Sequence, residues 1–374
     1  MSLTRSKFCP LPGAGALETR ENSNPEMNAD DQHLRSGRTA GLATDIGGAE
    51  PGRFTLVQRV LREAGIGVAL FVMVAVFSAF APHFTDQSNI TNILTQVTIN
   101  LIMATGMTFV ILIGGIDLSV GSVLAFAAMV AGVVLKSEAL PVPVAIALAV
   151  LTSIAVGMAC GFVNGFIASF WGVPSFIVTL GMLNIARGAA LEVTNARTLF
   201  EFPNQFNDFG TATVLGAPAI FLVALVLVVL GWAILTRTVF GRLIYAIGNN
   251  EEAVRLSGHN TFSYKVAAFV ISGLTVGIGA IVYMARLTIA SPILGSGFEL
   301  NAIAAVIIGG TSLSGGRGSL IGTFLGACLI GVLADGLILM GVGDFVRQMI
   351  TGGVIILAVI LDCYRAKLTS GESR

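Results

Sequence analysis

Charged side chains are scarce in this sequence. Asp, Glu, Lys and Arg make up 11% of the 374 residues, whereas hydrophobic residues make up 55% and the mean hydropathy is +0.86. A soluble domain carries about a quarter charged residues, so these few could not cover a water-facing surface. The formal net charge is zero, which gives no reason to expect nucleic acid as a partner. The composition predicts an all-α, polytopic membrane protein.

Cysteine is also rare. Cys9, Cys160, Cys328 and Cys363 lie far apart, and three of the four are in apolar runs or at their edges. They show neither the spacing of metal ligands nor a disulfide pattern. We therefore interpret them as small hydrophobic residues and predict no metal site.

Two kinds of energy-coupling motif are missing. The sequence has no glycine-rich phosphate loop, so we expect this chain to bind neither ATP nor another cofactor. It also has no cluster of carboxylates deep in its apolar runs, which argues against the proton or sodium relay of a secondary carrier. Asp117 is the one acidic residue embedded between two predicted spans, and we interpret it as an interfacial helix cap.

The number of long gaps between charged residues predicts the number of membrane crossings. A helix needs about 20 apolar residues to cross a bilayer, and gaps of about this length recur from Glu63 to Asp362. The gap between Glu138 and Arg187 is long enough for two spans. We predict about ten crossings within a membrane domain of residues 56–365. The stretch 299–310 is short, so we expect a half-span or a broken helix there.

The polar ends of the chain frame this membrane domain. Residues 1–55 are mostly polar and mixed in charge, which predicts a disordered tail, and residues 366–374 form a second short tail. The loops predicted to lie outside, 81–89 and 194–216, carry one basic residue between them, whereas the inside loops hold several. The positive-inside rule therefore places both termini in the cytoplasm.

A charged segment, residues 246–260, lies between two very apolar runs. Asn249 can cap a helix with Glu252 as its capping-box partner, and Gly258 stands where a left-handed C-cap is needed. Glu251 also lies in the first turn, where the helix dipole favours negative charge, and it can pair with Arg255 one turn later. The pattern predicts a capped helix of about two turns. It is either a docking element or a simple connector, and the capping favours docking.

An internal sequence repeat suggests a duplication. "GGIDLSVG" at 114–121 and "GGTSLSGG" at 309–316 share both leading glycines, the Leu-Ser pair and the final glycine. Many transporters are built from repeated halves whose broken helices occupy matching positions. Chance recurrence of glycine-rich turns is the alternative, and the sequence leaves open whether the halves are parallel or inverted.

Four segments together carry a family resemblance: "GGIDLSVGS" (114–122), "GFVNGFIASFWGVPSFIVTLGML" (161–183), "GRLIYAIGNNEEAVRLSG" (241–258) and "IGGTSLSGGRGSLIGTFLGA" (308–327). From about residue 60 to 365 the chain resembles the permease subunit of a bacterial ATP-binding cassette importer of the ribose, xylose and galactose class. The resemblance implies a multi-pass protein of the inner membrane. Its partners would be two ATPase domains, a periplasmic sugar-binding protein and a second permease copy, and ATP would be used by the ATPase.

The resemblance also assigns roles to residues. It implies that the segment 246–260 is the coupling helix that fits a groove on the ATPase, formed by Asn249, Asn250, Glu251, Glu252, Arg255 and Gly258. A neutral sugar needs amide and hydroxyl groups along its path. Polar residues within the apolar runs are the candidates, namely Asn100, Asp117, Ser119, Asn164, Asn184, Arg187, Asn301 and Ser314. Each Asn could equally join neighbouring helices.

Two other functions remain open from the sequence. The same architecture could import another small solute, such as a branched-chain amino acid or a sugar-like signal. A secondary carrier coupled to ions would instead work without an ATPase partner. A carrier of that kind needs a charged relay in the membrane, which the sequence does not favour.

Overall fold

The computed structural model describes the backbone of residues 51–371 and the side chains of residues 65–360. The chain divides after Phe54 into two units, and the second, residues 55–374, holds nearly all of the described residues. The predicted N-terminal tail lies outside the described residues up to position 50, whereas residues 51–55 belong to the first helix. At the other end, the last helix continues to Gly371, beyond the predicted start of the C-terminal tail at 366.

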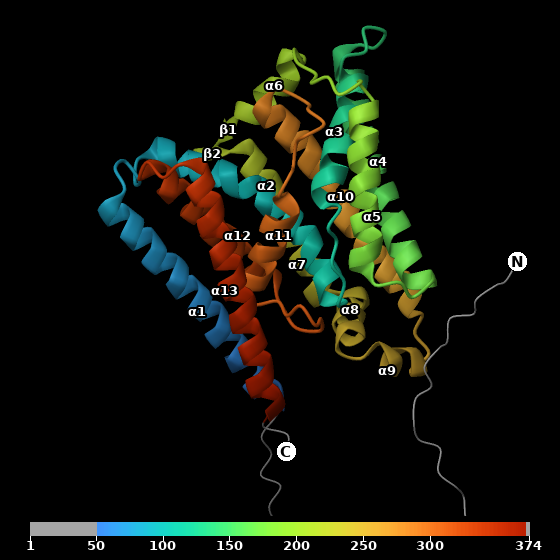
Figure 1. The fold of residues 1–374 in the computed structure, drawn as a ribbon, viewed down its shortest axis with the longest axis vertical. Coiled ribbons are helices and arrows are strands. Elements are labelled where there is room, and N and C mark those ends of the chain that lie inside the picture. The colour runs from blue at the N-terminus through green and yellow to red at the C-terminus, as the bar shows by residue number, and fades with distance from the viewer. Residues whose placement is uncertain (1–50, 372–374) are drawn as a thin grey trace, which may run out of the picture. The chain divides into compact units, whose positions relative to one another are not determined.

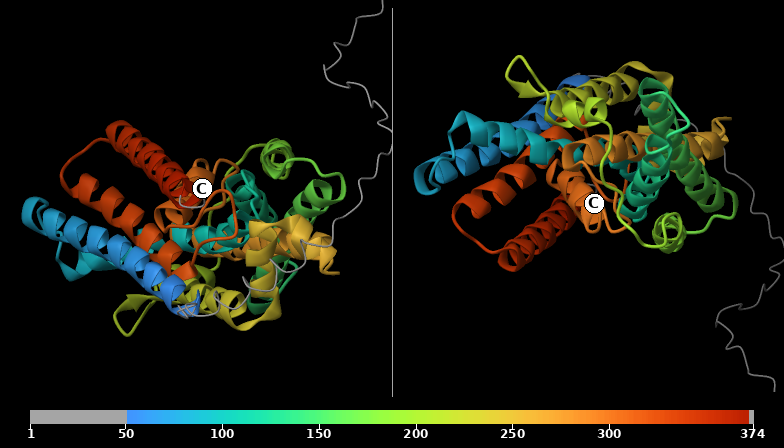
Figure 2. Two further views of the ribbon diagram at one scale, coloured as in Figure 1. Left: turned by 90° about the horizontal axis from the view of Figure 1, so that it is seen from below. Right: turned by 90° about the horizontal axis from the view of Figure 1, so that it is seen from above.

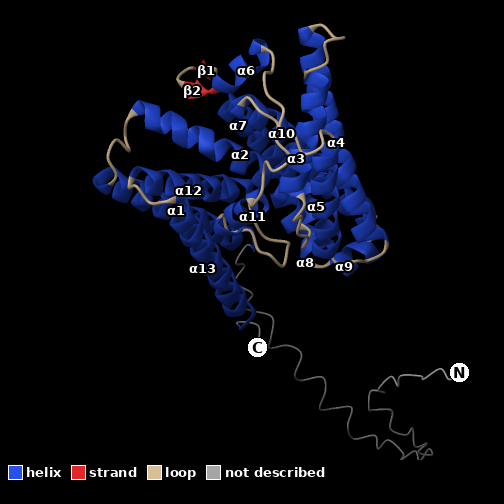
Figure 3. Ribbon diagram, turned by 45° about the horizontal axis from the view of Figure 1, so that its top comes forward, coloured by secondary structure: helices blue, strands red, loops and turns tan. Residues whose placement is uncertain are grey.

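The described part of the chain is almost entirely helical, which confirms the predicted all-α class (Figure 3). A two-residue hairpin pairs Thr213 with Pro218 in the antiparallel sense. The elements are α1 (Pro51–Phe80), α2 (Gln87–Leu112), α3 (Val120–Leu135), α4 (Val142–Phe170), α5 (Ser175–Glu192), α6 (Asn204–Thr211), β1 (Thr213–Val214), β2 (Ala217–Pro218), α7 (Ala219–Arg237), α8 (Val239–Asn249), α9 (Glu251–Leu256), α10 (Thr261–Leu287), α11 (Phe298–Ile308), α12 (Leu320–Leu339) and α13 (Asp344–Gly371).

Five of the described helices are long and apolar enough to cross a membrane: α2, α4, α7, α10 and α12. Shorter apolar helices occur at 65–80, in α3 and in α11. The half-span expected at 299–310 is α11, which has 11 residues. The backbone before it is irregular, because Gly295 and Gly297 both adopt positive φ. The full count of about ten crossings stays a prediction.

Helix α2 lies at the centre of the fold. Its residues from Val97 to Leu112 are almost all buried, and it contacts α10, α12, α11 and α7. Helices α12 and α13 lie on one side of it, with α4 and α5 on the other (Figures 1 and 2). The outer helices expose large apolar side chains, including Phe162, Phe170, Trp171 and Phe345. Contact with lipid accounts for such a surface, because exposing it to water would be unfavourable.

Helices α4 and α10 approach each other most closely. A Cβ atom at Gly157 or Gly161 of α4 would collide with a backbone carbonyl oxygen of α10. A Cβ atom at Gly273 of α10 would collide in the same way with the carbonyl of Gly157. The hydroxyl of Ser153 donates to the Gly277 carbonyl at 2.8 Å, across the same contact. Small residues of this kind let membrane helices pack through their backbones.

Candidate functional site

The predicted surface helix is α9, and its N-cap is Asn250. The backbone of Asn250 is extended, with φ −161°, and its side-chain oxygen accepts the N–H of Ala253 at 3.0 Å. The prediction that Asn249 is the cap was wrong, because Asn249 is still the last helical residue of α8. The capping box with Glu252 fails for the same reason. Glu252 is the second residue of the helix, so it is one position short of the box.

The charges of α9 pair differently from the prediction. Arg255 contacts Glu252 at 2.7 Å, one turn away, and not Glu251. Glu251 instead accepts from Lys265 of α10 at 3.1 Å, because the chain folds back and brings α10 beside the start of α9. Exposed pairs of this kind contribute little to stability.

The C-terminal end of α9 confirms that Gly258 forms the predicted left-handed C-cap. Its φ is +84°, and its N–H donates to the carbonyl of Arg255 at 3.0 Å. The next N–H, of His259, reaches the carbonyl of Val254 at 3.4 Å. These two bonds are those of a Schellman cap. Val254 is also the one buried side chain of α9, and it packs with Leu243 and Ile247 of α8. The rest of α9 is exposed.

The two glycine-rich segments end helices in the same way, but in different registers. Gly114 and Gly310 both have positive φ, at +77° and +82°, and each follows the C-cap of a helix. Each donates to the carbonyl three residues earlier, and the next N–H donates to the carbonyl five residues before it. The sequence repeat aligns Gly114 with Gly309, whereas the equivalent backbone conformation occurs at Gly114 and Gly310. The two structures are therefore displaced by one residue relative to the sequence alignment. The shared motif is a helix stop.

Three of the predicted path residues meet in one buried polar cluster, which we define as Asp117, Ser119, Asn164 and Ser272. Asp117 accepts from the N–H of Ser119 at 3.0 Å and from its hydroxyl at 2.6 Å. The Ser119 hydroxyl in turn accepts from the Asn164 amide at 2.9 Å. The Ser272 hydroxyl lies 3.4 Å from the other oxygen of Asp117. Asp117 therefore holds the residue that precedes α3, as a cap would, but inside the protein.

The cluster has one unused acceptor. The side-chain oxygen of Asn164 is buried and has no hydrogen-bond partner among the described residues. Asn164 is 1% exposed, and its amide nitrogen already donates to Ser119. A buried polar atom without a partner is costly, so this oxygen is available to a hydroxyl donor or a water molecule.

Sequence reasoning missed the residues that hold the segment 116–118. The hydroxyl of Ser175 accepts the N–H of Ile116 at 3.0 Å, and that of Thr179 accepts the N–H of Leu118 at 3.1 Å. Both hydroxyls come from α5, one helical turn apart. They satisfy backbone groups that an unwound segment cannot pair within a helix. The available signal was the i, i+4 spacing of two hydroxyls in the first, otherwise apolar turns of this helix.

The other predicted path residues do not join the cluster. Arg187 donates to the carbonyl of Leu294 at 3.0 Å and to that of Pro292, so it faces the irregular segment before α11. Asn184 is exposed on α5, and within the part of the chain that the structure describes it bonds only to its own helix. Asn100 and Asn301 lie half-buried on α2 and α11, and Ser314 is exposed in the loop before α12.

Asp117 is not the only embedded carboxylate, as the sequence had suggested. Asp335 is 3% exposed and lies within α12, which continues to Leu339. It accepts from the amide of Asn89 at 2.8 Å and from that of Gln96 at 3.2 Å. Counting gaps between charges had placed Asp335 at the end of a span. The amide donors from α2 are what allow it to lie inside the protein.

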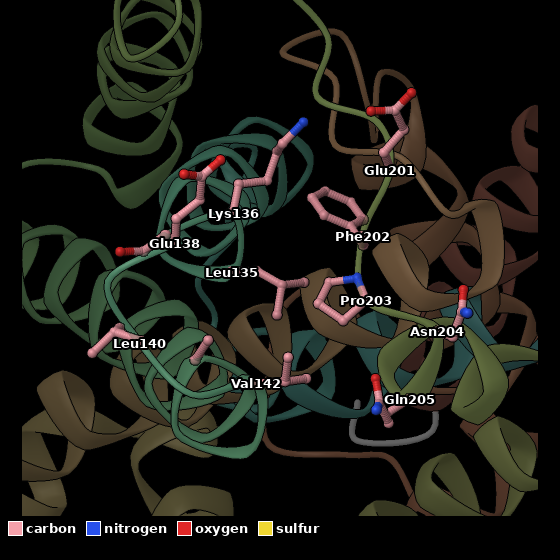
Figure 4. Close-up of a pocket in the computed structure, with 12 residues that line it drawn as sticks. Leu135, Lys136, Glu138, Leu140, Val142, Glu201, Phe202, Pro203, Asn204 and Gln205 are labelled. Atoms are coloured by element: carbon pink, nitrogen blue, oxygen red, sulfur yellow. The ribbon is translucent and has the colours of Figure 1, made fainter.

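A hollow of about 750 Å³ opens between the α3–α4 turn and the segment before α6. Figure 4 shows charged ends of Lys136, Glu138 and Glu201 around it, with Leu135 and Pro203 between them. The Lys136 ammonium donates to the carbonyl of Phe200 at 2.9 Å, which ties the two walls together. This hollow lies at the end of the helices opposite α9 (Figure 1).

Comparison with known proteins agrees with this architecture. The family model described as branched-chain amino acid transport system / permease component matches residues 89–359. The ribose import permease of Escherichia coli K12 is 40% identical over 315 residues, covering 83% of this chain and 97% of that protein. The D-allose transport permease of the same strain is 36% identical over 294 residues, covering 78% and 89%. No solved structure matches.

A third relative extends the set to another bacterium. The L-arabinose ABC transporter permease of Azospirillum brasilense is 32% identical over 309 residues, covering 83% of this chain and 90% of that protein. The family model spans nearly all of the described membrane helices after α1. The chain therefore belongs to this family of transport-system permease components, and the resemblance to permeases of ATP-binding cassette importers is confirmed.

Proposed function

We propose that this chain is the permease subunit of an ATP-binding cassette importer that carries a monosaccharide across the bacterial inner membrane. The observation that carries the proposal is α9, a short, capped and exposed helix at one end of a bundle of apolar helices. An ATPase that is not itself embedded in the membrane needs a protruding element of this kind as a binding surface on the permease. The chain itself performs no catalysis and binds no cofactor, and ATP is used by the partner ATPase.

The relatives favour a sugar over an amino acid. The family description names branched-chain amino acid transport, but the three relatives are permeases for ribose, allose and arabinose. These aldoses are neutral and rich in hydroxyl groups. The buried polar cluster offers amide and hydroxyl groups that match such a solute, with the unused oxygen of Asn164 as an acceptor. Asn100, Arg187, Asn301 and Ser314 would line further parts of the path.

Uptake in a deletion strain tests this function. Removing the gene from the bacterium that encodes it should lower uptake of radiolabelled ribose, allose or arabinose at least tenfold, and restoring the gene should recover it. Uptake of radiolabelled leucine serves as the control and should not change. Loss of leucine uptake with all three sugars unaffected would contradict the proposal.

We further propose about ten crossings, with both termini in the cytoplasm. The five long apolar helices, together with α1, α3, α5, α11 and α13, would supply them. The repeated sequence at 114–121 and 309–316 supports an origin by duplication, although the helix caps at Gly114 and Gly310 lie one residue out of register with it. In this orientation α9 faces the cytoplasm, and the hollow beside Lys136 faces the periplasm, where the sugar-binding protein would dock. A second permease copy would complete the path.

Replacing Asp117 by Asn is expected to leave sugar uptake within about threefold of wild type. The Asn oxygen can still accept from the N–H and hydroxyl of Ser119, so the start of α3 stays capped. Asp117→Ala removes the acceptor and leaves a buried N–H unpaired, which costs about 1–3 kcal/mol. Yield of folded protein and uptake should therefore fall in the Ala variant. Collapse of uptake in a well-folded Asn variant would instead favour an ion-coupled carrier.

A further inference from the structure

Three segments that are far apart in the sequence meet at the C-terminal end of α8. They are residues 248–249, the end of α2 at Leu112, and the loop 309–319 that precedes α12. A Cβ atom at Gly248 would collide with the Leu112 carbonyl oxygen and with the backbone nitrogen of Gly316. All three backbones are therefore in direct contact, with no side chain between them.

Hydrogen bonds close this junction. The N–H of Gly316 donates to the carbonyl of Leu112 at 2.9 Å. This bond joins the loop before α12 directly to the end of α2, where the other glycine-rich loop begins. The side-chain amide of Asn249 donates to the carbonyl of Gly316 at 3.2 Å. The Tyr245 hydroxyl donates to the carbonyl of Gly318 at 3.0 Å, so α8 holds the loop at two points.

The side chain of Asn249 is exposed, but its amide is bonded to the loop before α12. Its amide also donates to the carbonyl of Tyr245 at 2.9 Å, within α8. The residue directly after it, Asn250, caps α9. One residue, Asn250, thus separates the helix that would contact the ATPase from a residue bonded to the loop before α12.

We propose that Tyr245, Gly248 and Asn249 are positioning residues that transmit movement of α9 to the two glycine-rich loops. The proposal rests on the proposed function, in which α9 docks on the ATPase. Loop 113–119 leads into α3 and carries Asp117 and Ser119, and loop 309–319 leads into α12. A displacement of the α8 end shifts both loops together, because backbone contacts leave no free space.

The construction of the junction suits such a role. The two loops contain four glycines with positive φ, at which the backbone can change direction: Gly114, Gly310, Gly315 and Gly316. The α8 end is rigid by comparison, because Leu243, Ile244 and Ile247 bury its apolar face. When the rigid end of α8 is displaced, the two flexible loops change conformation and α8 does not.

The test uses the permease purified with its ATPase and reconstituted in vesicles with radiolabelled ribose. The variants are Asn249→Ala and the milder Tyr245→Phe, which removes only the hydroxyl that bonds to Gly318. We expect the ATPase to co-purify and ATP hydrolysis to continue, while ribose transported per ATP falls at least fivefold for Asn249→Ala and at least twofold for Tyr245→Phe. Thr236→Ala is the matched control, because among the described residues Thr236 bonds only to the carbonyl one turn earlier in α7. It should keep the wild-type ratio.

A second readout follows the loop itself. Ser314 is exposed, so Cys at this position, in a background without the four native cysteines, should react with a water-soluble thiol reagent. The rate should change when hydrolysis is trapped with vanadate, and Asn249→Ala should abolish that change. A wild-type ratio and an intact response in both variants would overturn the proposal, as would loss of the ATPase from Asn249→Ala, which would place Asn249 in the docking surface. Failure of the unmodified chain to retain any ATPase would instead contradict the proposed function.

Discussion

Gly273→Val is expected to prevent normal assembly of the membrane domain. The new side chain would collide with the carbonyl of Gly157 and approach the Cα atom of Met158 to 3.2 Å. These are backbone atoms, so the clash is relieved only when α4 and α10 move apart. Overpacking of a well-packed interior typically costs about 1–3 kcal/mol, and a clash between backbones belongs at the upper end.

Separation of these two helices also reaches the buried polar cluster. Ser272 directly precedes Gly273 and faces Asp117, while Asn164 comes from α4. The Ser153 bond to the Gly277 carbonyl, now 2.8 Å, would be lost as well. Sugar uptake should therefore disappear even in the fraction of protein that still inserts.

The measurement is the yield of monodisperse protein after extraction in detergent, together with its melting temperature. Gly181→Val in α5 is the matched control, because it places the same side chain in a helix where a Cβ atom has no described neighbour within 4 Å. The control should retain wild-type yield. A Gly273→Val protein that matches the control in yield, melting temperature and uptake would show that α4 and α10 do not pack through their backbones.

The sequence was sufficient for the class of fold because the membrane imposes simple rules. In a membrane the backbone groups must be paired within helices or a closed barrel, and apolar runs of about 20 residues between the charges favour helices and locate them. The rule failed at Asp335, where amides from a distant helix allow a carboxylate to lie inside α12. Partners that come from other elements cannot be recognised in a single apolar run.

The candidate site was predicted in part for the same reason. Local rules located α9 and its glycine cap, since both depend on neighbours within one turn. They misassigned the N-cap by one residue, because Asn249 and Asn250 have equal capping preference and only the tertiary bond of Asn249 to Gly316 separates them. Ser272 and Thr179 were missed because their partners lie more than 60 residues away.

The double variant Glu252→Lys, Gly258→Val is expected to abolish docking of the ATPase while the membrane helices still assemble. The backbone of Gly258 has φ +84°, where a side chain costs about 1–2 kcal/mol and a β-branched one more. Glu252→Lys replaces the partner of Arg255 with a like charge and opposes the dipole at the helix start. A helix of six residues has no reserve of stability to absorb both changes.

The spans should be unaffected, because a Cβ atom at Gly258 meets no atom of the described residues within 4 Å. Co-purification of the ATPase and ATP hydrolysis in reconstituted vesicles are the measurements, and both should fall at least tenfold. Gly216→Val in the β1–β2 turn is the matched control, with φ +82°, no neighbour within 4 Å in the part of the chain that the structure describes, and a position at the opposite end of the helices (Figure 1). It carries the same backbone strain and should retain docking. If the ATPase co-purifies with the double variant as well as with this control, α9 only connects two helices. The ATPase-binding surface must then lie elsewhere on the same face.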